Sequence, residues 1–358
     1  MANLDGDRLA SAFRKLGDMA TAAHVAGMVA LGIRTGLYRA MDGLGWTTSE
    51  ELAHRAGLSE RWVREWLYGQ AAAGVVEHED GERFSLAPEI AALVVDERSL
   101  FYMGGNFTSL PNRMSLVPKI EEAFRTGIGL SYDDRGPEAA ADTELIFGNW
   151  YRQMLVPVGL PALGDDVVAR LANGGRVADV GCGAGVALVE LAKAFPGADL
   201  HGYDTSRHAL ARAEANKAEA GVANVHFHAA DSDPLPGDAS FDLVTTFDCL
   251  HDMTHPEVVV AAIRRAVKPD GVWLIADIAC GPTFAEYVAK RPAFASMTYA
   301  MSVYSCMSSS LSEPGGAGLG TCGLPEPAMR ELVTAGGFGH FRSLPIEHPV
   351  NAFYEARP

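Results

Sequence analysis

The hydrophobic pattern of the second half of the chain differs from that of the first. Short apolar runs typical of buried strands alternate there with segments whose apolar residues recur at helical spacing, at 186–195 and 256–267. The expected strands are 176–180, 199–203, 225–229, 241–247 and 272–277. Strands that alternate with helices are typical of a parallel sheet, so the pattern predicts an α/β fold.

The first expected strand runs into a glycine-rich turn, Asp179-Val180-Gly181-Cys182-Gly183-Ala184-Gly185. Glycines let the backbone turn sharply and approach a ligand, and the start of the following helix can face that ligand. The second strand ends in Asp204, whose carboxylate can accept hydrogen bonds from both hydroxyls of a ribose. The segment therefore predicts a site for a nucleoside-bearing cofactor.

A dinucleotide site is the alternative, but there two residues separate the second and third glycines. The Gly-x-Gly-x-Gly spacing, with Asp179 two residues before the first glycine, resembles motif I of the class I S-adenosylmethionine (SAM)-dependent methyltransferases. The resemblance covers about half of the chain. It implies a Rossmann-like domain with a mostly parallel seven-stranded sheet, whose one antiparallel strand would come from a closing hairpin at 338–345 and 349–356.

The resemblance also implies which residues hold the cofactor. Asp204 would bind the ribose, and Asp231, after the third strand, would accept from the exocyclic amine of the adenine. The full set expected on the cofactor is Asp179, Gly181, Cys182, Gly183, Gly185, Asp204, Thr205, Asp231, Ser232, Phe247 and Asp248.

A His-Asp pair, His251-Asp252, follows the fourth strand and resembles the pair of plant-type small-molecule O-methyltransferases, in which the histidine is the general base. A histidine titrates near neutral pH and suits the removal of a hydroxyl proton. Asp277, at the end of the fifth strand, corresponds to the acid that orients this base. The third acid of those relatives has no match in 318–323, so nitrogen, sulfur and carbon acceptors stay open. A purely local hydrogen-bonding role for His251 or Asp277 is the alternative.

Residues 47–97 form a separate pattern. A capping box at Thr48 opens a helix that ends at Gly57, a second helix starts at Ser59, and two short strands flank Asp80 and Gly81. This order resembles the winged-helix domain that precedes the catalytic domain in plant-type O-methyltransferases and in a group of actinobacterial methyltransferases. The resemblance implies a dimerisation domain, and we expect a homodimer.

The charge disfavours several classes of partner. The chain has 45 Asp and Glu against 29 Lys and Arg, and the segment 47–97 holds 4 Arg, no Lys and 11 acidic residues. Because phosphate binding requires a basic surface, we expect neither nucleic acid nor an anionic membrane as a partner, and regulation of DNA is a minor alternative. The apolar run Met19–Ile33 is short and contains His24, so it predicts neither a leader peptide nor a membrane span.

The five cysteines form no Cys-x-x-Cys pair. They are expected as small buried apolar residues in a reducing, cytoplasmic compartment, and no metal is predicted.

The length exceeds what one core serves, which predicts several domains. They are a helical and winged-helix dimerisation domain at 1–99, a helical linker at 100–155 that contributes to the substrate pocket, and the SAM-binding domain at 156–358 with a pocket insertion at 282–323. Because the linker and the insertion are rich in aromatic and apolar residues, we expect a small hydrophobic or aromatic acceptor, with a hydroxyl as the methylated group. A SAM-binding regulatory protein without transferase activity is the alternative hypothesis.

Overall fold

The computed structural model describes residues 4–358, apart from the side chain of Ala293. The chain divides into two compact units, one up to Met114 and one from Ser115 onward. The predicted domain boundaries at 99 and 155, and the roles predicted for the three segments, stay predictions.

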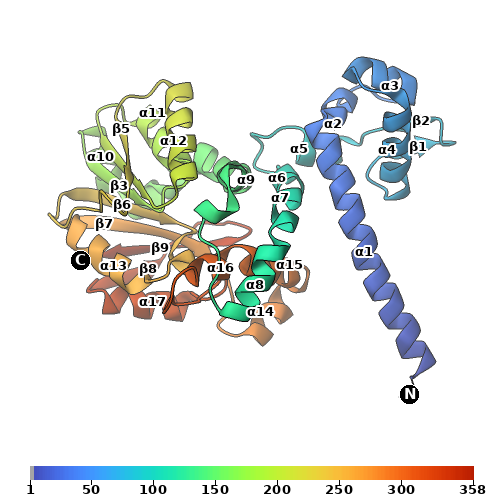
Figure 1. The fold of residues 1–358 in the computed structure, drawn as a ribbon. Coiled ribbons are helices and arrows are strands. Elements are labelled where there is room, and N and C mark those ends of the chain that lie inside the picture. The colour runs from blue at the N-terminus through green and yellow to red at the C-terminus, as the bar shows by residue number, and fades with distance from the viewer. Residues whose placement is uncertain (1–3) are drawn as a thin grey trace. The chain divides into compact units, whose positions relative to one another are not determined.

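The first unit is mainly helical, with one small hairpin (Figure 1). Its elements are α1 (Gly6–Arg34), α2 (Leu37–Met41), α3 (Ser49–Ala56), α4 (Glu60–Ala72), β1 (Glu77–Glu79), β2 (Arg83–Ser85), α5 (Pro88–Val94), α6 (Gly104–Thr108) and α7 (Leu110–Ser115). The predicted capping box at Thr48 is present, because its side chain accepts from the backbone of Glu51 while the Glu51 side chain accepts from the backbone of Thr48. The helix, helix, wing order of the prediction is confirmed.

The last turns of α1 pack closely on α4 around Gly32. A Cβ atom at Gly32 would lie 2.4 Å from the ring of Trp66 and 2.6 Å from that of Tyr38, so only glycine fits there. The Trp66 indole donates to the backbone oxygen of Met28 at 2.9 Å. Both rings belong to the core of this unit, which therefore depends on a small residue at position 32.

The first part of α1 is exposed, and the helix is longer than the expected apolar run. Helix α1 (Gly6–Arg34) is long and apolar enough to cross a membrane by length and composition alone, a test that one helix near the N-terminus also passes in proteins without a membrane span. Leu9, Phe13 and Leu16 are exposed large apolar side chains along it. They recur at the spacing of one helical face, which is typical of a contact surface.

The second unit contains the sheet (Figure 1). Its helices are α8 (Val117–Thr126), η1 (Asp133–Arg135), α9 (Pro137–Trp150), the π-helix η2 (Tyr151–Gly159), η3 (Pro161–Leu163), α10 (Asp165–Ala172), α11 (Val186–Ala194), α12 (Arg207–Ala220), η4 (Leu250–Asp252), α13 (Pro256–Ala266), α14 (Phe284–Lys290), α15 (Pro292–Tyr304), α16 (Cys306–Ser310) and α17 (Glu326–Ala335). Its strands are β3 (Arg176–Val180), β4 (Asp199–Asp204), β5 (Val225–Ala229), β6 (Phe241–Phe247), β7 (Val267–Ile278), β8 (His340–Ser343) and β9 (Asn351–Arg357).

The seven strands lie in the order β5-β4-β3-β6-β7-β9-β8. Strands β3 to β7 pair in parallel, and β9 runs antiparallel to both of its neighbours, β7 and β8. The predicted Rossmann-like sheet with one antiparallel strand is therefore confirmed. The chain passes from β3 outward to β5 and then returns to β6, so the strand order reverses between β3 and β6.

Two hydrophobic cores cover the two faces of the sheet, because successive side chains of a strand point to opposite faces. Val177 of β3 and Leu243 of β6 belong to the core formed with α10 and α11. Their neighbours Ala178 and Val244 belong to the core formed with α13 and α17. Helices on both faces bury the parallel strands and leave the carboxyl ends of the strands for ligands.

Candidate active site

The predicted glycine turn links β3 to α11, and its three glycines have positive φ angles of 74°, 53° and 70° at Gly181, Gly183 and Gly185. A Cβ atom at Gly181 would lie 2.7 Å from Cβ of Cys249, and one at Gly185 would lie 2.5 Å from the ring of Phe227. A Cβ atom at Gly183 would have no other atom within 4 Å. Two glycines are therefore required by packing, and the third leaves the backbone open to a ligand.

Asp204 anchors this turn from the end of β4. One carboxylate oxygen accepts from the backbone N–H of Gly183 at 2.8 Å and the other from that of Ser206 at 2.8 Å. Burial raises the pKa of Asp204, although the two N–H donors act in the opposite direction. The carboxylate thus fixes the glycine turn against the start of α12.

Two further carboxylates lie at the ends of neighbouring strands. Asp179 on β3 accepts from the hydroxyl of Thr245 at 2.7 Å, and burial raises its pKa to about 7. Asp248, directly after β6, accepts from the side-chain amide of Asn351, and burial together with the charge of Asp277 raises its pKa to about 7. Asp248 also has a positive φ of 52°, a conformation that aspartate tolerates better than most residues.

These three carboxylates surround the point where the strand order reverses. Ligands of open α/β sheets bind there, outside the carboxyl ends of the strands. Within the described part of the chain, Asp179, Asp204 and Asp248 form no ion pair with lysine or arginine. Buried carboxylates without a cationic partner are costly, so the arrangement fits a ligand that brings positive charge.

The other residues expected on the cofactor lie in two environments. Thr205, Asp231 and Ser232 are exposed at the ends of β4 and β5. Cys182 and Phe247 are buried and belong to the hydrophobic core. Their contact with a cofactor stays a prediction.

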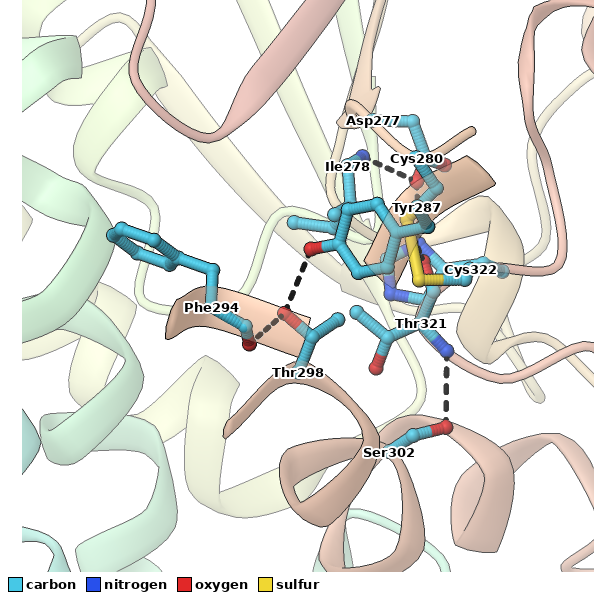
Figure 2. The surroundings of a disulfide bond; sticks show 10 residues. Asp277, Ile278, Cys280, Tyr287, Phe294, Thr298, Ser302, Thr321 and Cys322 are labelled. Atoms are coloured by element: carbon cyan, nitrogen blue, oxygen red, sulfur yellow. Dashed lines mark hydrogen bonds and ion pairs between the residues drawn. A yellow bond between two sulfur atoms is a disulfide. The ribbon is translucent and has the colours of Figure 1, made fainter. Parts of the chain in front are cut away.

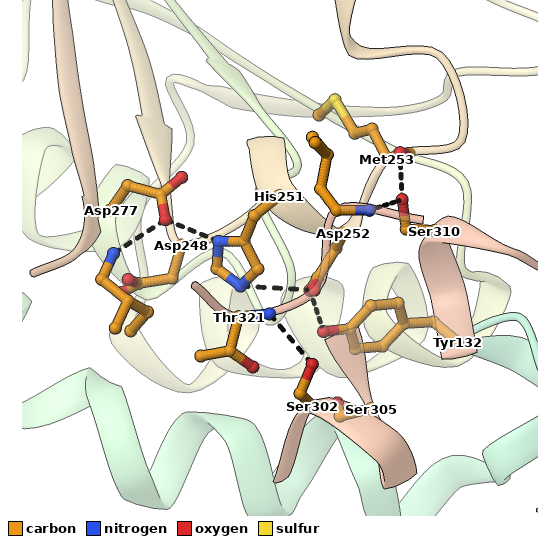
Figure 3. Close-up of polar contacts among 12 residues, drawn as sticks. Tyr132, Asp248, His251, Asp252, Met253, Asp277, Ser302, Ser305, Ser310 and Thr321 are labelled. Atoms are coloured by element: carbon orange, nitrogen blue, oxygen red, sulfur yellow. Dashed lines mark hydrogen bonds and ion pairs between the residues drawn. The ribbon is translucent and has the colours of Figure 1, made fainter. Parts of the chain in front are cut away.

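His251 lies in the short helix η4 after β6 and is 2% exposed (Figure 3). Its Nδ1–H donates to Oδ1 of Asp277 at 2.6 Å, and its Nε2 lies 3.4 Å from Oδ1 of Asp252. The same oxygen of Asp277 accepts from the backbone N–H of Ile278 at 2.7 Å. The fold therefore brings the three predicted catalytic residues together, although their roles stay predictions.

The two carboxylates set the protonation of His251. Burial acts to lower the pKa of the imidazole, but the negative charges of Asp277 and Asp252 outweigh it and raise the pKa well above its usual value. The imidazole can therefore hold a proton that it has accepted.

The segment 100–155, expected to contribute to the substrate pocket, completes this cluster through Tyr132, a contact that the sequence did not indicate. The hydroxyl of Tyr132 donates to Oδ2 of Asp252 (Figure 3). The next residue, Asp133, accepts from the hydroxyl of Ser206 at 2.8 Å and from Arg207 at 2.7 Å. Residues 132 and 133 therefore contact both the cluster around His251 and the segment after Asp204. The available sequence signal for these contacts was the polar run that follows Tyr132 inside the aromatic segment 100–155.

Two cysteines form a disulfide bond, Cys280–Cys322, across 42 positions of sequence (Figure 2). The expectation that all five cysteines are reduced apolar residues is therefore wrong for this pair, whereas Cys182, Cys249 and Cys306 are free. Cys280 follows the end of β7, and the insertion folds back so that the segment containing Thr321 and Cys322 meets it. Sequence spacing does not reveal such a pair.

Removing this disulfide is expected to destabilise the second unit. In the chain-entropy view, closing a loop of this length contributes about 3–4 kcal/mol to the free energy of unfolding. The variant Cys280→Ser/Cys322→Ser should unfold at lower denaturant concentration than the oxidised wild type. Wild-type protein in reductant is the matched control and should approach the variant. Equal midpoints for wild type with and without reductant would contradict the expectation.

Two parts of the chain match known families. Residues 171–312 match the family described as a methyltransferase domain. This chain carries a methyltransferase domain. Residues 23–95 match the Rv2258c-like winged HTH domain, so a winged helix-turn-helix domain precedes the methyltransferase domain. The resemblance stated from the sequence is confirmed for both parts.

Individual relatives agree with this assignment. The ubiquinone biosynthesis O-methyltransferase of Ralstonia nicotianae is 42% identical over 102 residues, which are 27% of this chain and 41% of that protein. The chain thus matches about two fifths of the length of this curated relative. Among solved structures, a putative O-methyltransferase from Nostoc punctiforme has a TM-score of 0.72 at 18% identity, covering 96% of this chain and 98% of that chain. Human N-acetylserotonin methyltransferase in complex with SAM has a TM-score of 0.65 at 16% identity, and the match covers 100% of this chain and 99% of that chain. These two structures share the fold of this chain.

Proposed function

We propose that this chain transfers the methyl group of SAM to a hydroxyl oxygen of a small apolar or aromatic acceptor, with His251 as general base. The observation that carries the proposal is the His251–Asp277 hydrogen bond, formed at the carboxyl ends of β6 and β7 in the methyltransferase domain. The printed names of the relatives, O-methyltransferases among them, support oxygen as the methylated atom.

The residues present fit SAM. The open backbone at Gly183 and the carboxylate of Asp204 suit a nucleoside, and the uncompensated carboxylates of Asp179 and Asp248 suit a ligand with ammonium and sulfonium charges. Bound SAM would supply a methyl group that is activated by its positively charged sulfur. No residue has to form a covalent intermediate, so the protein acts through alignment and proton removal.

His251 and its partners would handle the acceptor proton. Asp277 holds the imidazole by Nδ1, which leaves the lone pair of Nε2 to take the proton of the hydroxyl as its oxygen attacks the methyl carbon. The negative charges of Asp277 and Asp252 then stabilise the imidazolium. S-adenosylhomocysteine (SAH) and the methylated acceptor are the products.

An apolar acceptor is supported by the surroundings of α16. A pocket of about 120 Å³ is lined mainly by apolar residues of α8, α15 and α16, among them Ile120, Phe124, Val303 and Met307. Met307 follows Cys306, which lies beside His251. An aromatic or aliphatic group would bury apolar surface in such a setting.

The test of this proposal is the release of SAH from SAM over a panel of phenols and aliphatic alcohols, with amines and thiols as the comparison arm. We expect release that depends on a hydroxylated acceptor. Release with amines or thiols alone would overturn the oxygen assignment. SAM binding without release for any acceptor would instead favour the regulatory alternative.

The affinity for SAM is expected to rise with pH between about 6 and 8. Without ligand, the pKa values of Asp179 and Asp248 are about 7, so both carboxyls are mostly protonated at pH 6. A cationic ligand favours their charged forms, and each coupled carboxyl should contribute about tenfold to the affinity over this range. Calorimetry in two buffers of different ionisation heat measures both the affinity and the released protons.

A matched variant separates this coupling from a general pH effect. Asp179→Asn cannot ionise and should show a flatter pH dependence than wild type. SAH, which lacks the sulfonium charge, should also show a weaker dependence than SAM. Equal SAM affinity at pH 6 and pH 8 in the wild type would contradict the expected coupling.

We further propose that the chain is a homodimer that uses the exposed face of α1, and that it is cytoplasmic. Leu9, Phe13 and Leu16 lie on one face of that helix, and burial between two copies would remove them from water. Three of the five cysteines are free, which suits a reducing compartment, whereas the Cys280–Cys322 disulfide is unusual there.

Light scattering on the eluting protein tests the dimer. We expect twice the chain mass for wild type and the chain mass for Leu9→Glu/Phe13→Glu. Val258→Glu is the control, because Val258 is an exposed apolar residue of α13 in the other unit, and this variant should stay dimeric. A monomeric wild type that sediments with lipid vesicles would instead assign α1 to a membrane.

A further inference from the structure

Three potential metal ligands meet in the base cluster. Nε2 of His251, a carboxylate oxygen of Asp252 and Sγ of Cys306 all lie within 4.8 Å of one another. The three residues are 2%, 7% and 8% exposed, respectively. Ligand atoms of a tetrahedral zinc site are about 3.3–3.7 Å apart, and Nε2 lies 3.4 Å from Oδ1 of Asp252. Small side-chain movements would therefore suffice to close the three atoms around one ion.

Neighbouring groups orient these ligands. Asp277 accepts from Nδ1 of His251, which directs the Nε2 lone pair toward Asp252 and Cys306. Such a carboxylate–histidine contact is typical of zinc sites. Tyr132 donates to Oδ2 of Asp252, while Oδ1 of the same buried carboxylate has no hydrogen-bond partner. An unsatisfied buried carboxylate oxygen beside an imidazole nitrogen and a thiol is suited to a cation.

The donor types select the ion. One imidazole, one thiol and one carboxylate suit Zn²⁺, whereas Mg²⁺ and Ca²⁺ prefer oxygen ligands. Three protein ligands also leave a fourth position open, as in zinc sites that bind an exchangeable group. Cys280 and Cys322 are joined to each other and do not compete for the ion.

We propose that His251, Asp252 and Cys306 form a Zn²⁺ site whose occupation switches off the general base. This inference deepens the proposed function, because the ion and the acceptor proton would use the same lone pair of Nε2. The zinc-loaded form is therefore inactive, and removal of zinc by a chelator restores transfer. The site combines residues from η4 and α16, which lie more than fifty positions apart in the sequence.

The test is a titration of the full chain, first treated with chelator and dialysed, with Zn²⁺ by calorimetry and with Co²⁺ by absorption. We expect one ion per chain and the thiolate-to-cobalt charge-transfer band. Cys306→Ser should lose the band, and Cys249→Ser, which removes another free cysteine two positions before His251, should keep it. Asp277→Asn should weaken zinc affinity by about 10- to 100-fold, since outer contacts tune metal sites to that extent.

Two results would overturn the site: no stoichiometric Zn²⁺ binding by wild type, or a charge-transfer band that persists in Cys306→Ser. SAH binding by each variant reports whether it is folded, because none of the three ligands belongs to the expected cofactor set. If the wild type binds zinc but transfers methyl groups to no acceptor, the zinc site stands and the proposed enzymatic function is wrong. If the wild type transfers methyl groups but binds no zinc, the proposed function stands and the zinc site is wrong.

Discussion

Replacing His251 with alanine is expected to lower methyl transfer by about 10²- to 10⁴-fold, while SAH binds as in the wild type. In the proposed mechanism the imidazole takes the acceptor proton, and its partner Asp277 holds it in one orientation. SAH release with chelator present measures the transfer, on the best acceptor of the panel. His348→Ala is the matched control, since this partly buried histidine lies outside the His251 cluster. Full transfer by His251→Ala would show that alignment and desolvation suffice without a base.

The pH profile distinguishes a base from a structural histidine. Burial lowers and the two carboxylates raise the pKa of His251, with a net rise well above the usual value, so the imidazole loses its proton at a higher pH than a free histidine does. A base acts in its deprotonated form, and kcat/KM should therefore increase as pH rises above neutral. Asp277→Asn removes one negative charge and should shift this limb to lower pH. A merely structural role would leave the position of the limb unchanged.

Replacing Asp204 with alanine is expected to weaken SAH binding by about 10²- to 10⁴-fold. In the proposed site the carboxylate would accept two charge-assisted hydrogen bonds from a ribose, each contributing about 1.5–3 kcal/mol. It also accepts from the backbone of Gly183 and Ser206, so its loss releases the glycine turn. Calorimetric titration with SAH measures the effect.

The same strand offers a matched control. Asp199 begins β4 at the opposite end and pairs with Arg176, so Asp199→Ala should bind SAH as the wild type does. NAD should not bind the wild type, because the glycine spacing differs from that of a dinucleotide site. Undiminished SAH affinity in Asp204→Ala would contradict the assignment of the whole turn.

The glycine turn and the strand that ends in Asp204 could be predicted because their signals are local. Positive φ angles at Gly181, Gly183 and Gly185 are a property of adjacent residues, and a strand that ends in Asp204 is visible as an apolar run with a polar end. The same is true of the capping box at Thr48, which specified the start of a helix in the first unit. Family resemblance then extended these local signals to a mostly parallel seven-stranded sheet with one antiparallel strand, which the structure confirms.

The base cluster was predicted only in part. His251, Asp252 and Asp277 lie at strand ends, and parallel strands place their carboxyl ends at one edge of a sheet. Tyr132 and Cys306 come from segments with no regular spacing to that edge, and their contacts exist because η1 and α16 pack against η4. The same holds for the Cys280–Cys322 disulfide, which forms where the insertion folds back on the end of β7.

The order of residues was thus sufficient for the two domains, the parallel sheet, the glycine turn and the His-Asp pair, because each depends on backbone preferences and patterns within a few neighbouring positions. Long-range packing settled which distant side chains surround His251, how strongly their charges act on it, and which cysteines are joined. Burial and contact between residues far apart in the chain arise from the folded insertion as a whole, and no spacing in the sequence encodes them directly.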